Sequence, residues 1–180
     1  MNYFHFPVSF GTILINWNHE GQLSRIEWSE NRLAIFQKVK IPRPLADLVD
    51  QIRGYFYQGE PLGPVPWQCL DQSDWSVFQT KVYQIISTIP HGETRTYGWV
   101  ARQLCQASAS RAVGQALRKN PLPILIPCHR ITASNSMGGF MGCVDPSQPE
   151  MLLKRKLVLL EEEYRSPIFP FLASSVSLVG

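Results

Sequence analysis

Three prolines, Pro121, Pro123 and Pro127, surround an aliphatic run and restrict what this part of the chain can form. A proline has no backbone N–H, so it interrupts a helix and breaks the hydrogen-bond ladder of a central strand. Apart from Pro123, residues 122–126 are all leucine or isoleucine, which favours burial. We therefore expect a stiff, buried and extended segment that ends at Cys128.

The first part of the sequence has the pattern of a small sheet followed by a helix. Residues 12–17 and 23–28 are strand-like, and the polar turn between them ends in Gly21, which indicates a hairpin. Residues 45–57 carry apolar side chains three and four positions apart, which is the spacing of an amphipathic helix. Residues 59–74 are rich in proline and glycine and are interpreted as a linker.

Helical periodicity dominates the next part of the chain. It predicts helices over residues 77–88, 97–105 and 109–119. The last two are joined by a short turn, and the second carries Arg111 and Arg118. Two short helices joined in this way describe a helix-turn-helix, although any helical hairpin in a core can show the same pattern.

Positive charge is concentrated in the central part of the chain. Residues 1–77 have a net charge of −2 and residues 145–180 a net charge of −1. Residues 78–144 carry seven basic side chains and one acidic one, a net charge of +6. Such a stretch is typical of a protein that binds a polyanion. It is equally compatible with a solvated surface that has no partner.

The composition limits the class of protein. With 180 residues, 44% hydrophobic and 17% charged, the chain can form one domain or two small ones and is neither disordered nor fibrous. No apolar stretch reaches the roughly 18 residues of a membrane span, and the N-terminal residues lack an export signal. The four cysteines form no CxxC pair, so we expect a reduced, cytoplasmic location.

Cys128 is followed directly by His129 and Arg130. A cysteine attacks as the thiolate, and its ordinary pKa of about 8.5 means that it needs a basic or cationic neighbour. Neighbouring side chains of an extended chain point to opposite faces, so we expect His129 to reach Cys128 through a water molecule. The residue type alone also fits a small buried hydrophobic side chain.

Residues 120–131, with the core Pro127-Cys128-His129-Arg130-Ile131, resemble the active-site signature of the O6-alkylguanine-DNA alkyltransferases. A Pro-Cys-His-Arg core is rare, so the match is specific. The likeness is strong over residues 75–142, weaker over the N-terminal hairpin and around Tyr55, and it fades after Pro167. It implies DNA repair by irreversible transfer of an alkyl group from a flipped guanine to the cysteine.

The resemblance also implies roles for individual residues. Cys128 would accept the alkyl group, His129 would act as base through water, and Glu161 in the closing helix would orient His129. Asn120 would tie the helix-turn-helix to the active-site segment. Tyr97 would press on the phosphate of the target nucleotide and assist protonation of the leaving group.

DNA binding is implied for the second helix of the helix-turn-helix, where Arg111 would enter the base stack in place of the flipped guanine. The family's helix lies in the minor groove, which is only about 6 Å wide, against roughly 10–12 Å for a helix with its side chains. Small residues allow a close approach. This helix offers Ala109, Ser110, Ala112 and Gly114.

The substrate pocket that the resemblance implies is formed by five residues, Pro123, Ile131, Phe140, Met141 and Lys154. Phe140 departs from the family, which often has a tyrosine there, and Cys143 stands where the family has a glycine. Residues 145–150 look like an insertion before the last helix. Some members hold zinc with N-terminal cysteines, but no cysteine precedes Cys69, so we expect no metal and no cofactor.

The resemblance implies an α+β fold. We expect an N-terminal α/β lobe with a small antiparallel sheet over residues 1–75. A helical DNA-binding and alkyl-acceptor domain, with a winged-helix-like helix-turn-helix, would span residues 76–167, and a C-terminal tail residues 168–180. The expected partner is double-stranded DNA containing alkylated guanine, and alkylated O4 of thymine is a second expected substrate. We expect a monomer that works once, with cooperative binding to DNA as an open alternative.

Three other functions fit parts of the sequence. A lesion-binding protein of the same fold would lack the acceptor cysteine, which Cys128 supplies. A transcription regulator would present Asn, Gln or Arg to the bases, and the small residues of the second helix suit that poorly. A cysteine hydrolase needs an oxyanion hole, and the sequence has no pattern for one.

Overall fold

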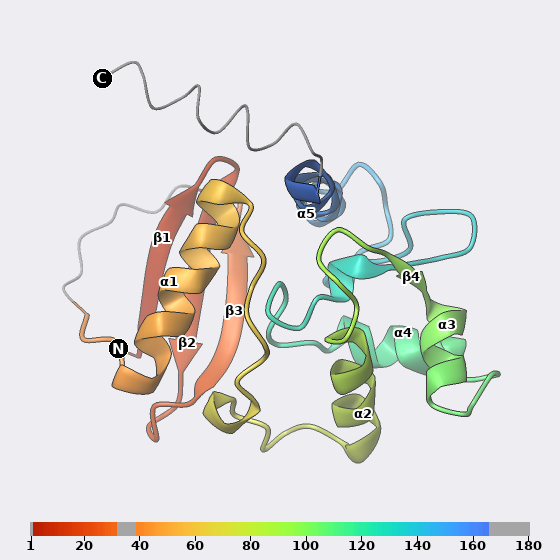
Figure 1. Ribbon diagram of the computed structural model, residues 1–180, viewed down its shortest axis with the longest axis horizontal. Coiled ribbons are helices and arrows are strands. Elements are labelled where there is room, and N and C mark those ends of the chain that lie inside the picture. The colour runs from red at the N-terminus through yellow and green to blue at the C-terminus, as the bar shows by residue number, and fades with distance from the viewer. Residues whose placement is uncertain (1, 32–38, 166–180) are drawn as a thin grey trace.

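The computed structural model describes residues 2–31 and 39–165, whose elements form two groups with α5 (Pro149–Arg165) between them (Figure 1). The tail expected over residues 168–180 and the end of the second domain at residue 167 lie outside the described residues. No helix in the described part of the chain is long and apolar enough to cross a membrane.

The N-terminal group is a three-stranded antiparallel sheet in the order β1-β2-β3, with one helix across it (Figure 1). Its strands are β1 (Tyr3–Val8), β2 (Gly11–Trp17) and β3 (Leu23–Ser29). The helix, α1 (Arg43–Gln58), buries an apolar stripe and ends where Gly59 adopts a left-handed φ of 72°. The predicted hairpin and helix are therefore confirmed.

The predicted linker, residues 59–74, contains a short 3-10 helix, η1 (Trp67–Cys69). Beside it, the N–H of Asp71 donates to the carbonyl of Leu23 at 2.8 Å, which attaches this segment to β3. The linker is thus packed against the sheet and is not a free spacer.

The second group is mostly helical and contains α2 (Val77–Ile86), α3 (Tyr97–Gln103) and α4 (Ser110–Arg118). Ser76 and Gln79 form a capping box that fixes the start of α2. The helices α3 and α4 pack against each other and both contact α2. A short parallel pair, β4 (Arg95–Thr96) with β5 (Ile131–Thr132), joins the start of α3 to the chain that follows Cys128.

The proline-rich segment is buried as expected, but the prediction that it is extended was wrong. Ile124 has a φ of 78°, and the N–H of Ile126 donates to the carbonyl of Leu122 at 2.9 Å, so the chain turns back on itself. The prolines remove donors and exclude regular structure, and the remaining N–H groups are satisfied locally inside a turn. The turn leads into a 3-10 helix, η2 (Cys128–Arg130).

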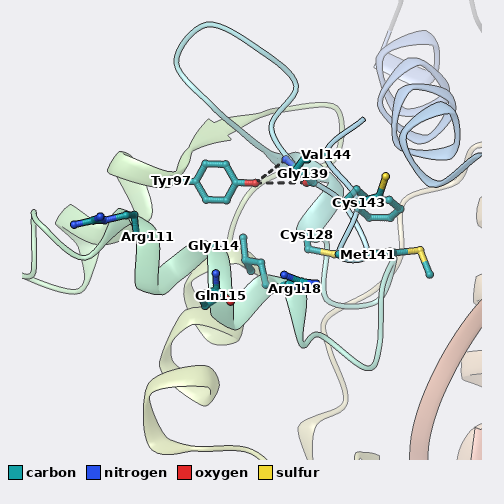
Figure 2. Close-up of a pocket in the computed structure, with 13 residues that line it drawn as sticks. Tyr97, Arg111, Gly114, Gln115, Arg118, Cys128, Gly139, Met141, Cys143 and Val144 are labelled. Atoms are coloured by element: carbon teal, nitrogen blue, oxygen red, sulfur yellow. Dashed lines mark hydrogen bonds between the residues drawn. The ribbon is translucent and has the colours of Figure 1, made fainter. Parts of the chain in front are cut away.

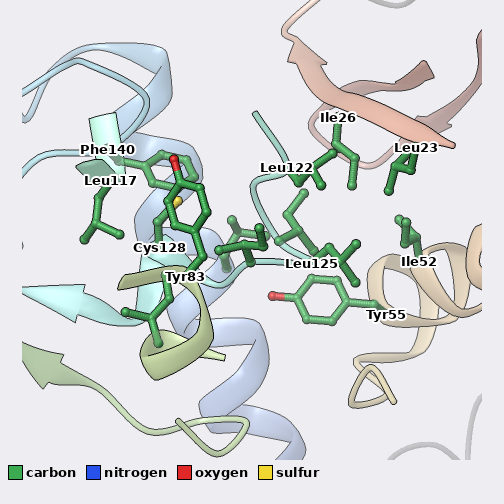
Figure 3. Packing of buried hydrophobic residues seen from close by; sticks show 14 of the residues in the cluster. Leu23, Ile26, Ile52, Tyr55, Tyr83, Leu117, Leu122, Leu125, Cys128 and Phe140 are labelled. Carbon is green, nitrogen blue, oxygen red and sulfur yellow. The ribbon is translucent and has the colours of Figure 1, made fainter. Parts of the chain in front are cut away.

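This turn carries its aliphatic side chains into the space between the two groups. Leu122 lies beside Ile26 of β3, and Leu125 lies near Tyr55 of α1 (Figure 3). All four side chains are buried, so the turn joins the core of the sheet to the core of the helices. The backbone of Cys128 is therefore held by packing on both sides.

Candidate active site

Cys128 is the first residue of η2, and its side chain is only 5% exposed. Asn120, two residues after α4, donates from Nδ2 to Sγ of Cys128 at 3.2 Å and to the carbonyl of Ile126 at 2.9 Å. Its Oδ1 accepts from the N–H of Leu122 at 3.0 Å. One amide side chain thus fixes the turn and contacts the sulfur.

Burial raises the pKa of the Cys128 thiol to about 11, and the hydrogen bond from Asn120 and the charge of Lys154 offset only part of this effect. At neutral pH the side chain is therefore the thiol and not the thiolate. The thiolate is the nucleophilic form of cysteine, so this site needs a base close by.

The buried carboxylate of Glu161 on α5 organises the groups behind Cys128. Its Oε1 accepts from Nε2 of His129 at 2.7 Å, from the hydroxyl of Tyr55 at 2.8 Å and from Nη2 of Arg130 at 3.0 Å. Its Oε2 accepts from the N–H of Gly92 and from Nε of Arg130, both at 2.9 Å. Burial raises the pKa of Glu161, but the hydrogen bonds and charges of His129 and Arg130 outweigh it and hold the pKa well below its usual range.

This bonding defines the tautomer of His129. An ionised carboxylate only accepts hydrogen bonds, so Nε2 carries the proton and Nδ1 carries the lone pair. Nδ1 is buried and has no hydrogen-bond partner in the described part of the chain. Burial lowers the pKa of His129, and Glu161 opposes this only in part. The imidazole is thus neutral, and its Nδ1 is free to accept a proton. His129 and Cys128 lie on the same short helix, η2.

A cavity of about 290 Å³ lies over Cys128 (Figure 2). Its walls come from Tyr97 at the start of α3, from one side of α4 and from a loop after β5. The lining residues are Tyr97, Arg111, Gly114, Gln115, Leu117, Arg118, Cys128, Gly139, Phe140, Met141, Gly142, Cys143 and Val144. The hydroxyl of Tyr97 accepts from the N–H of Gly139 at 3.2 Å and donates to its carbonyl at 3.4 Å, so it ties α3 to this loop.

The loop closes with a tight hairpin. The N–H and carbonyl of Phe140 exchange hydrogen bonds of 2.9 Å with those of Cys143. Met141 and Gly142 between them have φ values of 49° and 86°, which are those of a type I′ turn. Such a turn favours Asn or Asp followed by Gly, and this chain has a methionine at the first position.

The structure places only part of the expected pocket at the cavity. Phe140 and Met141 line it, whereas Pro123, Ile131 and Lys154 do not. Pro123 lies in the buried turn and Ile131 in β5. The ammonium of Lys154 points to three backbone carbonyls. It donates to that of Ile131 at 2.5 Å, to that of Gly139 at 3.1 Å and also to that of Met137. Lys154 therefore supports the loop from behind and is not part of the wall.

The expected DNA-binding helix, α4, turns Val113, Ala116 and Leu117 into the core and leaves Arg111 exposed. The guanidinium of Arg111 points away from Cys128 (Figure 2). Of the small residues, Ala112 is exposed, while the other three are half-buried: Ala109, Ser110 and Gly114. A Cβ on Gly114 would lie 3.8 Å from the ring of Tyr97, so this glycine also serves the contact of α4 with α3.

The positive charge of residues 78–144 is less uniform than the sequence indicates. Arg130 is buried on Glu161, and Nη2 of Arg95 lies 2.6 Å from the carboxylate of Glu93. The remaining basic side chains are exposed: Lys81, Arg102, Arg111, Arg118 and Lys119. The surface charge available to a polyanion therefore comes mainly from α2, α3 and α4.

Sequence reasoning missed two residues whose side chains form hydrogen bonds to Glu161. Arg130 counted as a surface charge, and Tyr55 counted as part of a weak likeness in α1. A signal for Tyr55 existed, because a tyrosine on the buried stripe of a helix needs a partner for its hydroxyl. Glu161 itself is buried, while the adjacent Glu162 and Glu163 are exposed. Of these three glutamates, the one that the resemblance indicated is therefore the one that points into the protein.

The site thus combines a buried thiol, a neutral imidazole and two short packed helices with a basic surface. Residues 77–164 match the family model described as 6-O-methylguanine DNA methyltransferase, DNA binding domain. A methylated-DNA–protein-cysteine methyltransferase of Mycolicibacterium paratuberculosis is 37% identical over 140 residues, which are 74% of this chain and 73% of that protein.

Solved structures show the same similarity. The crystal structure of Mycobacterium tuberculosis O6-methylguanine methyltransferase matches with 30% sequence identity and a TM-score of 0.68, and the match covers 92% of this chain and 94% of that chain. That of Mycobacterium tuberculosis OGT in complex with DNA is 29% identical with a TM-score of 0.68, over 94% and 98%. The chain belongs to the methylated-DNA–protein-cysteine methyltransferase family, which confirms the resemblance and the α+β fold.

Proposed function

We propose that this chain repairs double-stranded DNA by transferring an alkyl group from O6 of guanine to Sγ of Cys128. The observation that carries the proposal is the position of the thiol, which faces a cavity on one side and lies on the same turn as a neutral imidazole with a free nitrogen. The alkyl carbon forms a bond to sulfur while its bond to O6 breaks. The same displacement at O4 of alkylated thymine needs no further group.

His129 acts as the base in this proposal. Because the pKa of the Cys128 thiol is raised to about 11, the proton must leave as the alkyl carbon is attacked. Nδ1 of His129 accepts it through a water molecule, and Glu161 stabilises the resulting imidazolium as a buried carboxylate does in a catalytic triad. The guanine leaves as an anion, and the hydroxyl of Tyr97, which faces the cavity, assists its protonation.

DNA binding and extrusion of the base belong to α3 and α4. A base inside a duplex is out of reach of a buried thiol, so the target must leave the stack, at a cost of a few kcal/mol. We place α4 in the minor groove, with Arg111 entering the stack in place of the guanine. The protein acts as a monomer, and each molecule acts once because none of these residues can remove an alkyl group from a thioether.

Mass spectrometry of the protein after reaction with DNA containing O6-methylguanine tests this function. The wild type should gain one methyl group on the peptide that carries Cys128, and Cys128→Ser should gain none, because a hydroxyl is a far weaker nucleophile. Cys143→Ser is the matched control, since Cys143 also lines the cavity and its loss should leave the transfer intact. Label on Cys69, Cys105 or Cys143 in the wild type would contradict the assignment.

A further inference from the structure

Tyr55 belongs to the N-terminal group, and its side chain forms a hydrogen bond to Glu161. It lies on α1, has no exposed surface, and its hydroxyl donates to Oε1 of Glu161 at 2.8 Å. The same hydroxyl lies 3.4 Å from Nε2 of His129. The Tyr55 hydroxyl thus meets Glu161, which is 106 positions away in the sequence, and His129, which is 74 positions away.

The direction of this hydrogen bond is fixed. The pKa of Glu161 lies well below its usual range, so the carboxylate is ionised and only accepts. Burial raises the pKa of Tyr55 well above its usual value, and the charge of Glu161 raises it further. Tyr55 therefore keeps its proton and donates at every pH at which the protein works.

The hydroxyl does more than packing requires. The ring of Tyr55 extends toward Leu125 in the core (Figure 3). The ring of the next residue, Phe56, which has no hydroxyl, meets it edge to face with 5.3 Å between the ring centroids. A phenylalanine at position 55 would fill the same space. The oxygen is the part of the side chain that reaches Glu161, and its contribution there is separate from packing.

Tyr55 and His129 share Oε1 of Glu161. A carboxylate offers about four acceptor sites, and Glu161 accepts five hydrogen bonds, so the carboxylate cannot rotate without losing several of them. The Tyr55 hydroxyl also competes with His129 for the charge on Oε1. By limiting rotation of the carboxylate, the hydroxyl holds the imidazole in place. By sharing the charge, it should also weaken the effect by which Glu161 raises the pKa of His129.

We propose that Tyr55 is a positioning residue for alkyl transfer, whose hydroxyl fixes the Glu161 carboxylate and so keeps His129 oriented with Nδ1 free for the Cys128 proton. The N-terminal group is then part of the reaction machinery as well as a support for the fold. This inference rests on the proposed function. It adds a residue from outside the matched DNA-binding domain, which begins at residue 77.

The test compares Tyr55→Phe with Tyr57→Phe, a matched control on the same helix whose hydroxyl donates instead to the carbonyl of Pro7. Single-turnover rates on O6-methylguanine DNA are measured against pH. Tyr55→Phe should lower the rate at least about tenfold, because His129 is no longer held in the geometry that accepts the proton. Tyr57→Phe should leave it unchanged. Urea unfolding should show that both variants remain fully folded under the assay conditions, with some loss of stability for Tyr55→Phe because a buried hydrogen bond is removed.

The pH profile distinguishes positioning from a general loss of packing. The titratable and charged groups around Glu161 and His129 come from four parts of the chain. They are Arg130 and Cys128 on η2, His91 after α2, Tyr55 on α1, and Lys154 and, beyond His91, Tyr164 on α5. Without the Tyr55 donor, more of the negative charge of Oε1 acts on the imidazolium and raises the pKa of His129, so the acid limb of the profile should move to higher pH even though the ring is less well oriented. A loss of rate with an unmoved acid limb would overturn the proposal.

A double variant and a second reagent complete the test. In a Glu161→Gln background, Tyr55→Phe should have little further effect on rate, and an undiminished further loss would contradict the proposal. Carboxamidomethylation of Cys128 by iodoacetamide requires no DNA, and Tyr55→Phe should slow it as well. If iodoacetamide shows the effect while the wild type takes no alkyl group from DNA, the proposed function fails and the positioning role stands.

Discussion

The two sides of Cys128 are built in opposite ways. Behind it, five hydrogen bonds converge on the carboxylate of Glu161, and the groups that donate them are enclosed. In front lies a cavity whose wall is a loop held by the hydroxyl of Tyr97 and a two-residue turn at Met141. The difference teaches that the groups behind Cys128 are constrained by many side-chain hydrogen bonds, whereas the wall in front of it is held by one tyrosine hydroxyl and a short turn. In the proposed reaction, the constrained side is the one that accepts the proton.

The largest effect should come from breaking the rear side with Glu161→Gln. It removes the charge that stabilises the imidazolium of His129, so the transfer rate should fall about 100-fold or more. It also leaves Arg130 buried without its partner charge, which costs about 3–5 kcal/mol of stability. Single-turnover rates and urea unfolding measure the two effects. Glu162→Gln, an exposed neighbour, should change neither.

The same carboxylate predicts how the protein responds to acid. The pKa of Glu161 is lower in the folded than in the unfolded chain, so its stabilising effect is complete above about pH 4.3 and is lost as the pH falls toward the folded value. Unfolding measured between pH 7 and pH 3 should show a smaller acid-induced loss for Glu161→Gln than for the wild type. Equal losses would mean that other carboxylates dominate.

The front side is tested by Arg111→Ala, which should affect extrusion of the base and leave the thiol unchanged. The rate on duplex DNA should fall by about tenfold, since the arginine no longer fills the gap in the stack. The rate on free O6-benzylguanine, where the cavity admits it, should stay near that of the wild type. His129→Ala should slow both substrates, and Arg102→Ala serves as an exposed control. Equal losses on both substrates for Arg111→Ala would assign this arginine to the fold.

The smallest effect should come from the hairpin in the front wall. Met141 has a φ of 49°, a conformation that costs an ordinary residue about 1–2 kcal/mol. Met141→Asn creates the Asn-Gly pair that a type I′ turn favours, so stability should rise by roughly 0.5–1 kcal/mol, seen as a higher urea midpoint. Gly142→Ala, at a φ of 86°, should lower it. A lower midpoint for Met141→Asn would show that the packing of the thioether outweighs the strain of the turn.

The local parts of this structure could be predicted from sequence. The helices α1, α2 and α4 each bury one face, so apolar spacing located them within a few residues. The helix α3 was expected to reach Cys105, but it ends at Gln103 because Cys105 takes a positive φ of 56°. Such a turn depends on how the chain enters α4, which periodicity does not contain.

The parts that failed depend on contacts distant in sequence. The aliphatic side chains correctly predicted burial of the proline-rich segment. The missing N–H groups exclude regular structure but do not specify which turn replaces it. Arg130 looked like a surface charge because nothing near it in sequence reveals Glu161. Lys154 was expected at the cavity, yet its ammonium finds three carbonyls behind the loop. Closeness to Cys128 in the sequence therefore did not decide which contacts were foreseen, because the role of Arg130 was missed while Glu161 on α5 was expected from the resemblance.

The raised pKa of Cys128 has a consequence for how long an unused molecule stays competent. Peroxides and stray electrophiles react with thiolates, and oxidation beyond the sulfenic acid is irreversible for most cysteines. A thiol that is 5% exposed and has a pKa of about 11 is almost entirely protonated in a neutral cell. If each molecule reacts only once, as we propose, this protonation keeps an unused molecule inert toward background chemistry.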